Sequence, residues 1–173
     1  MKKSAINKPA CYFDRYINQI EDIELAQAFQ QSLRALEQLD LGQLNCLGDL
    51  VYAEGKWTSK EIFQHLIDTE RILSYRALRI GRNDQTPLNG FDEAILAANV
   101  NLAGRTLESL IAEMKIVRQS SALLFESFDA TALHRLGTAS GIQMTPLAFG
   151  FTMLGHQKHH LDILAAKYLP LIA

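Results

Sequence analysis

The chain has 173 residues, which suits a single globular domain with a sizeable buried core. Apolar residues make up 48% of it and charged residues 21%, and both values are ordinary for such a domain. The formal net charge of −2 argues against a nucleic-acid partner, because proteins of that class usually carry a strong basic excess.

The first third of the chain predicts a lead-in, two helices and a connection. Residues 1–10 are expected to be a mobile lead-in, and residues 11–173 to form one domain. A short helix is expected over 11–20 and a longer one over 24–39, with a connection containing one helical turn over 40–57. The longer helix has an apolar stripe formed by Leu25, Phe29, Leu33, Leu36 and Leu39.

A second long helix begins at a recognisable cap. Thr58 and Glu61 match a capping box, and the periodic pattern continues to about Arg82. The apolar stripe of this helix is Ile62, Leu66, Leu73 and Ile80, and the flank of the stripe carries His65, Thr69 and Arg76. Residues 83–92 have turn chemistry. The whole connection to the third long helix is about twenty residues, so we expect it to cross one end of the bundle and form part of a pocket wall.

The second half of the chain predicts two more long helices. Asp92 caps a short helix that ends at Ala98, and a third long helix is expected over 102–128. Its inward residues are Leu107, Leu110, Ile111, Met114, Val117, Ser121 and Leu124. A loop with Gly137 and Gly141 follows, without any alternating strand pattern. Thr145 and Pro146 then open a fourth long helix that runs to about Leu169. The predicted fold class is an all-α four-helix bundle with short extra helices.

Location and partners follow from what the sequence lacks. No run of about 18 apolar residues is present, so no membrane span is expected. Residues 1–4 are basic but are not followed by the apolar stretch of a signal peptide. Cys11 and Cys46 are too few for a disulfide framework and fit reduced side chains. We therefore expect a cytoplasmic protein with a small-molecule substrate.

A pair of histidines on the fourth helix is the strongest chemical feature. His156 and His160 are four residues apart, so both imidazoles leave one helix face, which is otherwise apolar. Buried imidazoles need partners for their ring nitrogens, and one metal ion would satisfy both rings. Ordinary hydrogen bonds are the alternative. His65 on the second helix could be a third ligand, but spacing leaves open whether it faces the pair.

The remaining titratable residues have weaker patterns. His159 lies about 80° around the helix from the midpoint of the pair, so a supporting, rim or surface role is expected for it. His134 lies in a loop-like segment and is expected at the surface. Carboxylates could orient the imidazoles, or could be caps and solvated charges, and the candidates are Glu61, Asp68, Glu70 and Asp162.

Several common reaction motifs are absent from the sequence. The histidine pair lacks the glutamate of an HExxH zinc peptidase, and no Glu-x-x-His pair of a di-iron bundle occurs. Neither a glycine-rich phosphate loop nor a GxSxG nucleophile motif is present.

Five segments together resemble a known family. They are Gly-Lys-Trp-Thr-Ser-Lys-Glu-Ile at 55–62, His-Leu-Ile-Asp-Thr-Glu-Arg at 65–71, Thr-Pro-Leu at 86–88, Gly-Phe-Asp at 90–92, and Gly-His-Gln-Lys-His-His-Leu at 155–161. Over about residues 12–169 the chain is similar to the DinB/YfiT-like superfamily of metalloenzymes. The resemblance implies a mirror variant of the up-and-down bundle topology. It also implies one divalent metal ion, zinc or nickel, held by His65, His156 and His160.

The resemblance also implies a class of reaction. Some members of the superfamily use low-molecular-weight thiols such as bacillithiol or mycothiol as cosubstrates. A metal ion with three neutral ligands could lower the pKa of a thiol or water, so we expect a metal-dependent enzyme of thiol-dependent transferase type. The alternatives are a metal-dependent hydrolase, a non-catalytic metal- or small-ligand-binding protein related to stress, and a structural metal site.

Two finer expectations complete this reading. Arg76 on the His65 flank could receive an anionic group of the substrate, or could be a surface or ion-paired residue. A homodimer is expected from the resemblance, with the apolar side chains of residues 12–17 as a candidate interface. Those side chains fit a core equally well.

Overall fold

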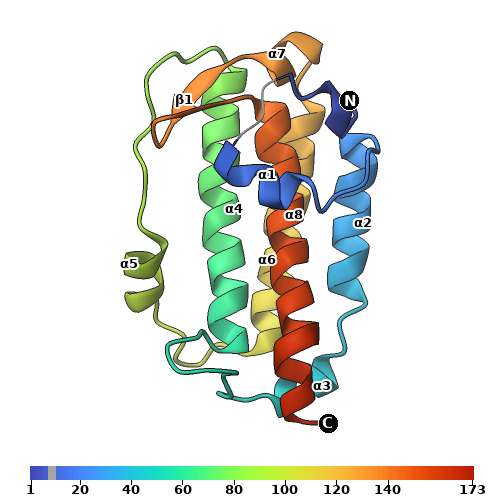
Figure 1. Cartoon of the computed structure of the whole chain (residues 1–173), viewed down its shortest axis with the longest axis vertical. Helices are drawn as coiled ribbons and strands as arrows, with labels where there is room; N and C mark the ends of the chain where they lie inside the picture. Colours follow the sequence, from blue (N-terminus) through green and yellow to red (C-terminus); the bar gives the residue numbers. More distant parts are fainter. Residues whose placement is uncertain (8–10) are drawn as a thin grey trace.

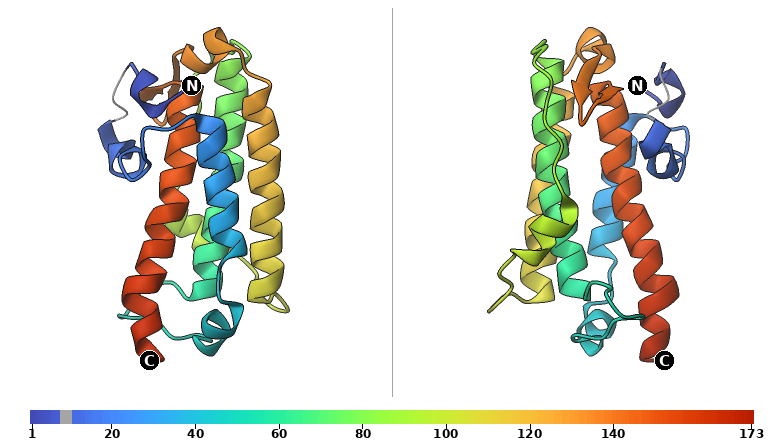
Figure 2. Two further views of the ribbon diagram at one scale, coloured as in Figure 1. Left: turned by 90° about the vertical axis from the view of Figure 1, so that its right-hand side faces the viewer. Right: turned by 60° about the vertical axis from the view of Figure 1, so that its left-hand side comes forward.

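The computed structural model describes residues 1–7 and 11–173, and of Cys11 only the backbone. Its long helices are α2 (Leu25–Glu37), α4 (Ser59–Gly81), α6 (Leu107–Glu126) and α8 (Pro146–Ile163). They lie side by side as a four-helix bundle, in which α4 and α2 each pack between α6 and α8 (Figure 1, Figure 2). The predicted all-α bundle with short extra helices is confirmed. None of the helices in the described part of the chain is long and apolar enough to cross a membrane.

The connection between α4 and α6 follows an unexpected path. It runs back along the outside of the bundle and carries α5 (Glu93–Ala98), so that α4 and α6 point the same way (Figure 1). The predicted crossing of one end of the bundle is wrong, because two helices that point the same way need a connection that returns along their length. The helix α6 also begins five residues later than the periodicity predicted, because Gly104 adopts a φ of 75° and Thr106 then caps the helix.

The starts of α4 and α8 agree with their sequence signals, whereas α8 ends at Ile163 instead of near Leu169 and the first short helix ends at Ile17 instead of Ile20. The Thr58 backbone donates to Glu61 Oε2 at 2.7 Å, and the Glu61 backbone donates to Thr58 Oγ1 at 3.3 Å, which is the predicted capping box. Thr145 Oγ1 accepts from the Ala148 backbone at 3.2 Å, with Pro146 at the first helical position. After Ile163 the chain continues through a π-helical turn, Leu164–Tyr168. The remaining short helices are Lys3–Ala5, Cys11–Phe13, α1 (Asp14–Ile17), α3 (Leu41–Cys46), α7 (Ala130–His134) and Leu169–Leu171.

The first residues lie against the start of α2. The Leu25 backbone donates to the Met1 carbonyl oxygen at 2.9 Å, and the Met1 ammonium group pairs with Glu24 at 2.5 Å. The mobility expected for residues 1–10 stays a prediction, and residues 8–10 lie outside the described residues.

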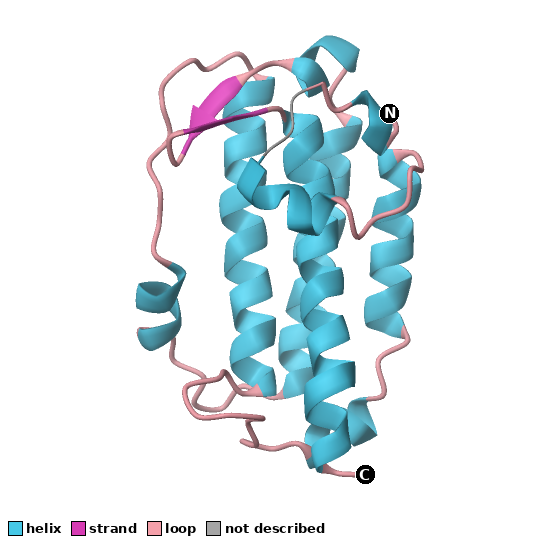
Figure 3. Ribbon diagram, viewed as in Figure 1, coloured by secondary structure: helices cyan, strands magenta, loops and turns pink. Residues whose placement is uncertain are grey.

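A small antiparallel hairpin replaces the loop predicted after α7. Strand β1 (Gly137–Ala139) pairs with β2 (Ile142–Met144) through a two-residue turn, Ser140–Gly141 (Figure 3). Both turn residues have positive φ, 52° and 75°, which is the geometry that matches strand twist. Three-residue strands are too short to display an alternating pattern, so they are not evident in the sequence. The segment before α5 joins this hairpin, because Ser140 donates its backbone N–H to Leu88 at 2.9 Å.

In the described residues the apolar core forms two clusters. One includes Leu25, Phe29, Leu73, Ile80, Phe125, Phe149 and Met153. The other includes Leu36, Ile62, Phe63, Leu66, Leu110, Met114, Leu164 and Tyr168. On each long helix the residues between the clusters are buried or half-buried and polar: Ser32 on α2, His65, Thr69 and Glu70 on α4, Arg118 and Ser121 on α6, and His156, Gln157 and His160 on α8. We call these residues the polar layer.

An ion pair lies at the centre of the polar layer. Arg118 is 0% exposed and Glu70 is 2% exposed, and Arg118 Nε lies 2.8 and 3.0 Å from the two carboxylate oxygens of Glu70. A second donor, Arg118 Nη2, lies 2.5 Å from Glu70 Oε2. Arg118 also donates to Ser32 Oγ, and Gln157 donates to the Ser32 carbonyl oxygen at 3.0 Å. The network therefore joins all four long helices.

Candidate metal centre

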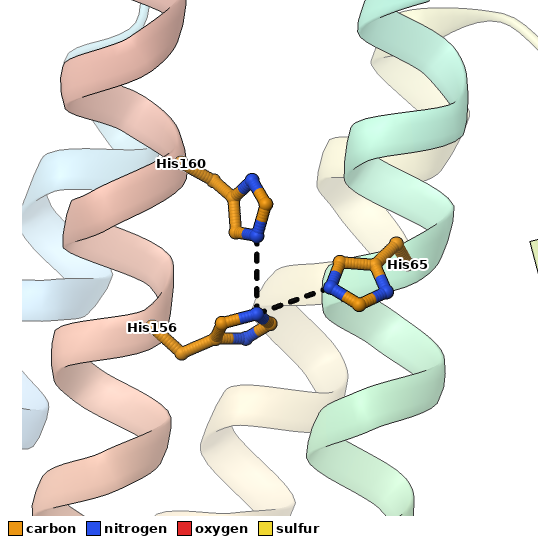
Figure 4. Close-up of side chains that lie close together, drawn as sticks. All are labelled: His65, His156 and His160. Atoms are coloured by element: carbon orange, nitrogen blue, oxygen red, sulfur yellow. Dashed lines mark hydrogen bonds between the residues drawn. The ribbon is translucent and has the colours of Figure 1, made fainter. Parts of the chain in front are cut away.

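Three histidines from two neighbouring helices come together in the polar layer. His156 Nε2 lies 3.1 Å from His65 Nε2 and 3.1 Å from His160 Nε2. One ring nitrogen from each of the three lies within 4.8 Å of the others. Figure 4 shows the rings pointing into the space between α4 and α8. The structure thus answers what spacing left open, since His65 faces the pair on α8.

The distances suit a metal ion better than hydrogen bonds alone. His156 Nε2 carries either one proton or one lone pair, so it cannot make a full hydrogen bond to both neighbours. A cation among three lone pairs would satisfy all three rings. For a metal–nitrogen distance of about 2.1 Å, tetrahedral ligands lie roughly 3.4 Å apart and octahedral neighbours about 3.0 Å apart. The two separations from His156 Nε2, both 3.1 Å, fall between these values, and all three nitrogens lie within 4.8 Å of one another. The donor set therefore fits a divalent ion.

Burial keeps the three imidazoles neutral. Desolvation lowers the pKa of His65 to about 4, and desolvation together with the nearby histidines lowers the pKa of His160 to about 3. The pKa of His156 lies well below its ordinary value, chiefly because of burial. At neutral pH all three rings can therefore offer a lone pair, and the group of three contains no carboxylate.

Neighbouring side chains restrain the rings. Thr69 Oγ1 lies 3.4 Å from His65 Nδ1, one turn further along α4. A proton on His65 Nδ1 leaves the lone pair of that ring on Nε2, facing the other histidines. The rings of Trp57 and Tyr16 pack against His65 and His156, with centroids 4.6 and 5.0 Å apart. The sequence analysis missed both aromatic residues as parts of the site, because their proximity depends on how distant segments pack.

The other two histidines lie outside the group. His159 is half-buried, with its ring 5.3 Å from His160 and 5.4 Å from Tyr16, which agrees with a position at the rim. The prediction of a surface position for His134 is wrong. His134 ends α7 and is half-buried, and its Nδ1 has no hydrogen-bond partner among the described residues.

The candidate carboxylates are occupied elsewhere. Glu61 forms the capping box, Glu70 pairs with Arg118, Asp68 accepts from Gln64 at 2.9 Å, and Asp162 pairs with Lys158 at 2.8 Å. The structure therefore gives each of these carboxylates a partner other than the three imidazoles.

Two cavities reach the group of three histidines. A cavity of about 470 Å³ reaches His156 and is also lined by Tyr16, Thr69, Arg76 and Phe91. A second cavity of about 370 Å³ reaches His160 and is lined by Lys56, Trp57 and Tyr168, among others. Residues 91–93 of the connection between α4 and α6 line the first cavity, as predicted for a pocket wall. A larger cavity, of about 540 Å³, lies between α2 and α6 and includes none of the histidines.

Comparisons with known proteins agree with this architecture. The structure of YfiT from Bacillus subtilis, described as a probable metal-dependent hydrolase with an unusual four-helix bundle topology, is similar to this chain with a TM-score of 0.64. The similarity covers 92% of this chain and 87% of that chain at 15% sequence identity, so it establishes the fold alone. No curated protein is significantly similar in sequence. The sequence profile of the DinB superfamily matches residues 24–164, and the chain therefore belongs to the DinB superfamily.

Proposed function

We propose that the protein binds one divalent metal ion through His65, His156 and His160 and is a metal-dependent enzyme. The observation that carries the proposal is the convergence of three neutral imidazoles, two of them buried and His160 half-buried, beside two cavities. Zinc and nickel both accept imidazole ligands, so either ion suits the site. Three protein ligands leave coordination open, whereas a structural zinc site usually has four.

A bound divalent ion would supply Lewis acidity, which lowers the pKa of a thiol or water placed beside it. The residues of the chain provide the surroundings for this chemistry. Thr69 Oγ1 lies within hydrogen-bonding distance of His65 Nδ1, and the rings of Tyr16 and Trp57 pack against His156 and His65.

A thiol-dependent transferase is our preferred reaction type. Transfer between a thiol cosubstrate and an electrophile needs room for two molecules, and the cavities at His156 and His160 provide two separate spaces. A metal-dependent hydrolase is the second candidate, supported by the description of YfiT. A non-catalytic metal- or small-ligand-binding protein is the third.

Elemental analysis of purified variants tests the metal site. We expect about one equivalent of metal in the wild type and in His159→Ala, a matched control one residue from the cluster. His65→Ala, His156→Ala and His160→Ala should each retain far less metal. Stoichiometric metal in all three variants would refute the assignment of the ligands.

A turnover assay separates an enzyme from a binding protein. Wild-type protein is incubated with 1-chloro-2,4-dinitrobenzene and a panel of low-molecular-weight thiols, with His160→Ala as the blank. Faster thioether formation by the wild type with one of the thiols is the expected result. If neither the thiols nor a set of ester substrates gave metal-dependent turnover, a non-catalytic binding protein would be favoured.

Two further proposals concern the location and the oligomeric state of the protein. We propose a cytoplasmic location and a homodimer, the latter because Tyr12 is 54% exposed beside α1. Tyr16 and Ile17 are buried within the chain and would contribute less to such an interface. Light scattering of the purified protein measures the mass directly, and a monomeric mass at micromolar concentration would refute the dimer.

A further inference from the structure

Arg76 is a buried guanidinium without a carboxylate partner. It is 3% exposed, and its Nη2 donates to the Asn89 carbonyl oxygen at 2.8 Å and to Ser140 Oγ at 2.9 Å. Its Nε and Nη1 donate to none of the described residues, and no carboxylate within that part of the chain forms an ion pair with it. Arg118 is the contrasting case, because it is equally buried and is fully paired with Glu70.

Such an arrangement is unfavourable for stability alone. Removing a cation from water costs several kcal/mol unless an anion or enough hydrogen bonds compensate for it. Burial lowers the pKa of Arg76, and no nearby carboxylate offsets this effect. Two hydrogen bonds from a group with five donors are incomplete compensation. A buried, unneutralised charge beside a cavity is a common feature of ligand sites.

The cavity beside Arg76 suits a small apolar molecule. Arg76 and His156 line the same space of about 470 Å³, which falls within the usual range for small-molecule sites. Its other lining is mainly aromatic and aliphatic and includes Tyr12, Phe13, Tyr16, Leu73, Phe91 and Ile142. The guanidinium lies over the ring of Phe91 at 5.2 Å from the centroid. The cavity thus combines mainly apolar walls with one guanidinium and one imidazole.

The hairpin turn holds Ser140 against Arg76. Ser140 has a φ of 52°, which is uncommon for a residue other than glycine, and its backbone N–H is fixed on Leu88. Its hydroxyl accepts a hydrogen bond from Arg76, so the hydroxyl proton is free to donate to a ligand. Ser140 lines the same cavity.

Two carboxylates also line this cavity, but neither neutralises Arg76. Asp92 Oδ1 accepts from the backbones of Ala94 and Ile95 at 2.8 and 3.3 Å, so its charge faces the start of α5. Glu93 is exposed. The positive charge of Arg76 therefore remains available to a ligand.

We propose that Arg76 and Ser140 bind the carboxylate group of a small apolar substrate whose other end reaches the three histidines. Arg76 lies eleven residues after His65 on α4, about 16.5 Å of helix rise, but it lines the same cavity as His156, which lies beside His65. One molecule of ordinary substrate size can therefore touch both groups. The contact between the substrate and the histidines rests on the proposed function, whereas the binding of its carboxylate rests on Arg76 and Ser140 alone.

Calorimetric titration with benzoate and with uncharged benzamide tests the carboxylate site. We expect wild-type protein to bind benzoate at least tenfold more tightly than benzamide. Arg76→Gln should weaken benzoate binding at least tenfold, and Arg76→Lys should weaken it less. The matched control is Arg71→Gln, which removes the same charge from an exposed position on α4 and should leave binding unchanged. Ser140→Ala should weaken benzoate binding a few-fold, and this variant tests the site if Arg76→Gln does not fold.

Metal content separates this proposal from the proposed function. His160→Ala is expected to lose metal and to bind benzoate as the wild type does, whereas Arg76→Gln should retain metal. Equal benzoate affinity in the wild type and the Arg76 variants would overturn the carboxylate site. The carboxylate site would also be overturned if His160→Ala lost both its metal and its benzoate binding, because benzoate would then be bound at the metal. Failure of the wild type to bind benzoate at millimolar concentration would overturn it as well.

Discussion

Replacing Glu70 by Gln is expected to destabilise the protein severely. The carboxylate accepts three contacts from Arg118 at 2.5 to 3.0 Å, and both side chains are almost fully buried. The amide keeps one acceptor but leaves the guanidinium unneutralised at the centre of the bundle. Breaking a buried pair from one side costs about 3–5 kcal/mol. We expect Glu70→Gln at the lower end of that range and Arg118→Met at the upper end.

Removing both charges should cost less than removing one. In the double variant Glu70→Leu with Arg118→Met no unpaired charge remains, and such replacements are often neutral or stabilising. Ser32 still pairs with Gln157 in that variant, so the rest of the network is retained. The cycle formed by Glu70→Leu, Arg118→Met and the double variant therefore isolates the cost of an unpaired charge.

Urea unfolding followed by circular dichroism measures these differences, with EDTA present so that metal binding makes no contribution. The matched control is Glu113→Gln, which breaks ion pairs with Arg71 and Arg105. Those side chains are 26% to 53% exposed, and the expected loss is about 0–1 kcal/mol. A loss for Glu70→Gln no larger than that of the control would refute the reasoning.

Three further predictions concern the site and its surroundings. Metal-free protein should lose stability as pH falls from about 6.5 to about 4. In this range His65 takes up a proton in the unfolded chain but stays neutral in the folded protein, where its pKa is about 4. His65 alone contributes about 3 kcal/mol, measured as the change in the free energy of unfolding, and a flat profile would contradict it. Zinc at about 100 times its Kd should raise stability by about 2.7 kcal/mol in the wild type and not in His160→Ala, as thermal unfolding with and without EDTA would show. Gly155→Ala should cost about 1–3 kcal/mol, because its methyl group would meet the Tyr16 carbonyl oxygen; a Tm equal to the wild type would count against this packing.

The sequence predicts the helices well but not their mutual placement. Local signals such as the Thr58 capping box and the Thr145–Pro146 start act within a few residues, so they are visible in the chain alone. The position of His65 opposite His156 depends on which helices become neighbours, and only the family resemblance indicated it. The strands of the hairpin have three residues each, too few to display an alternating pattern, and their bridge to Leu88 joins segments about fifty residues apart in the sequence.

The burial of Arg118 was indicated by its position in the helical pattern. Arg118 lies four residues after Met114 and three before Ser121, both on the inward face of α6. Its position on the helix therefore indicated burial, but its charge favoured a solvent-exposed reading. Buried charges are rare unless they are paired, and a partner on another helix cannot be identified from a single chain.

The polar layer also has a consequence for how precisely the bundle is assembled. Apolar faces tolerate sliding of one helix past another, because one leucine can replace its neighbour in the same groove. If one helix moved along its neighbour by one turn, Arg118 and Glu70 would be left unpaired. The polar layer therefore favours one axial alignment of the four helices. The three histidines belong to the same polar layer. Substitutions in either apolar cluster can therefore alter stability while the alignment of His65 with His156 and His160 is preserved.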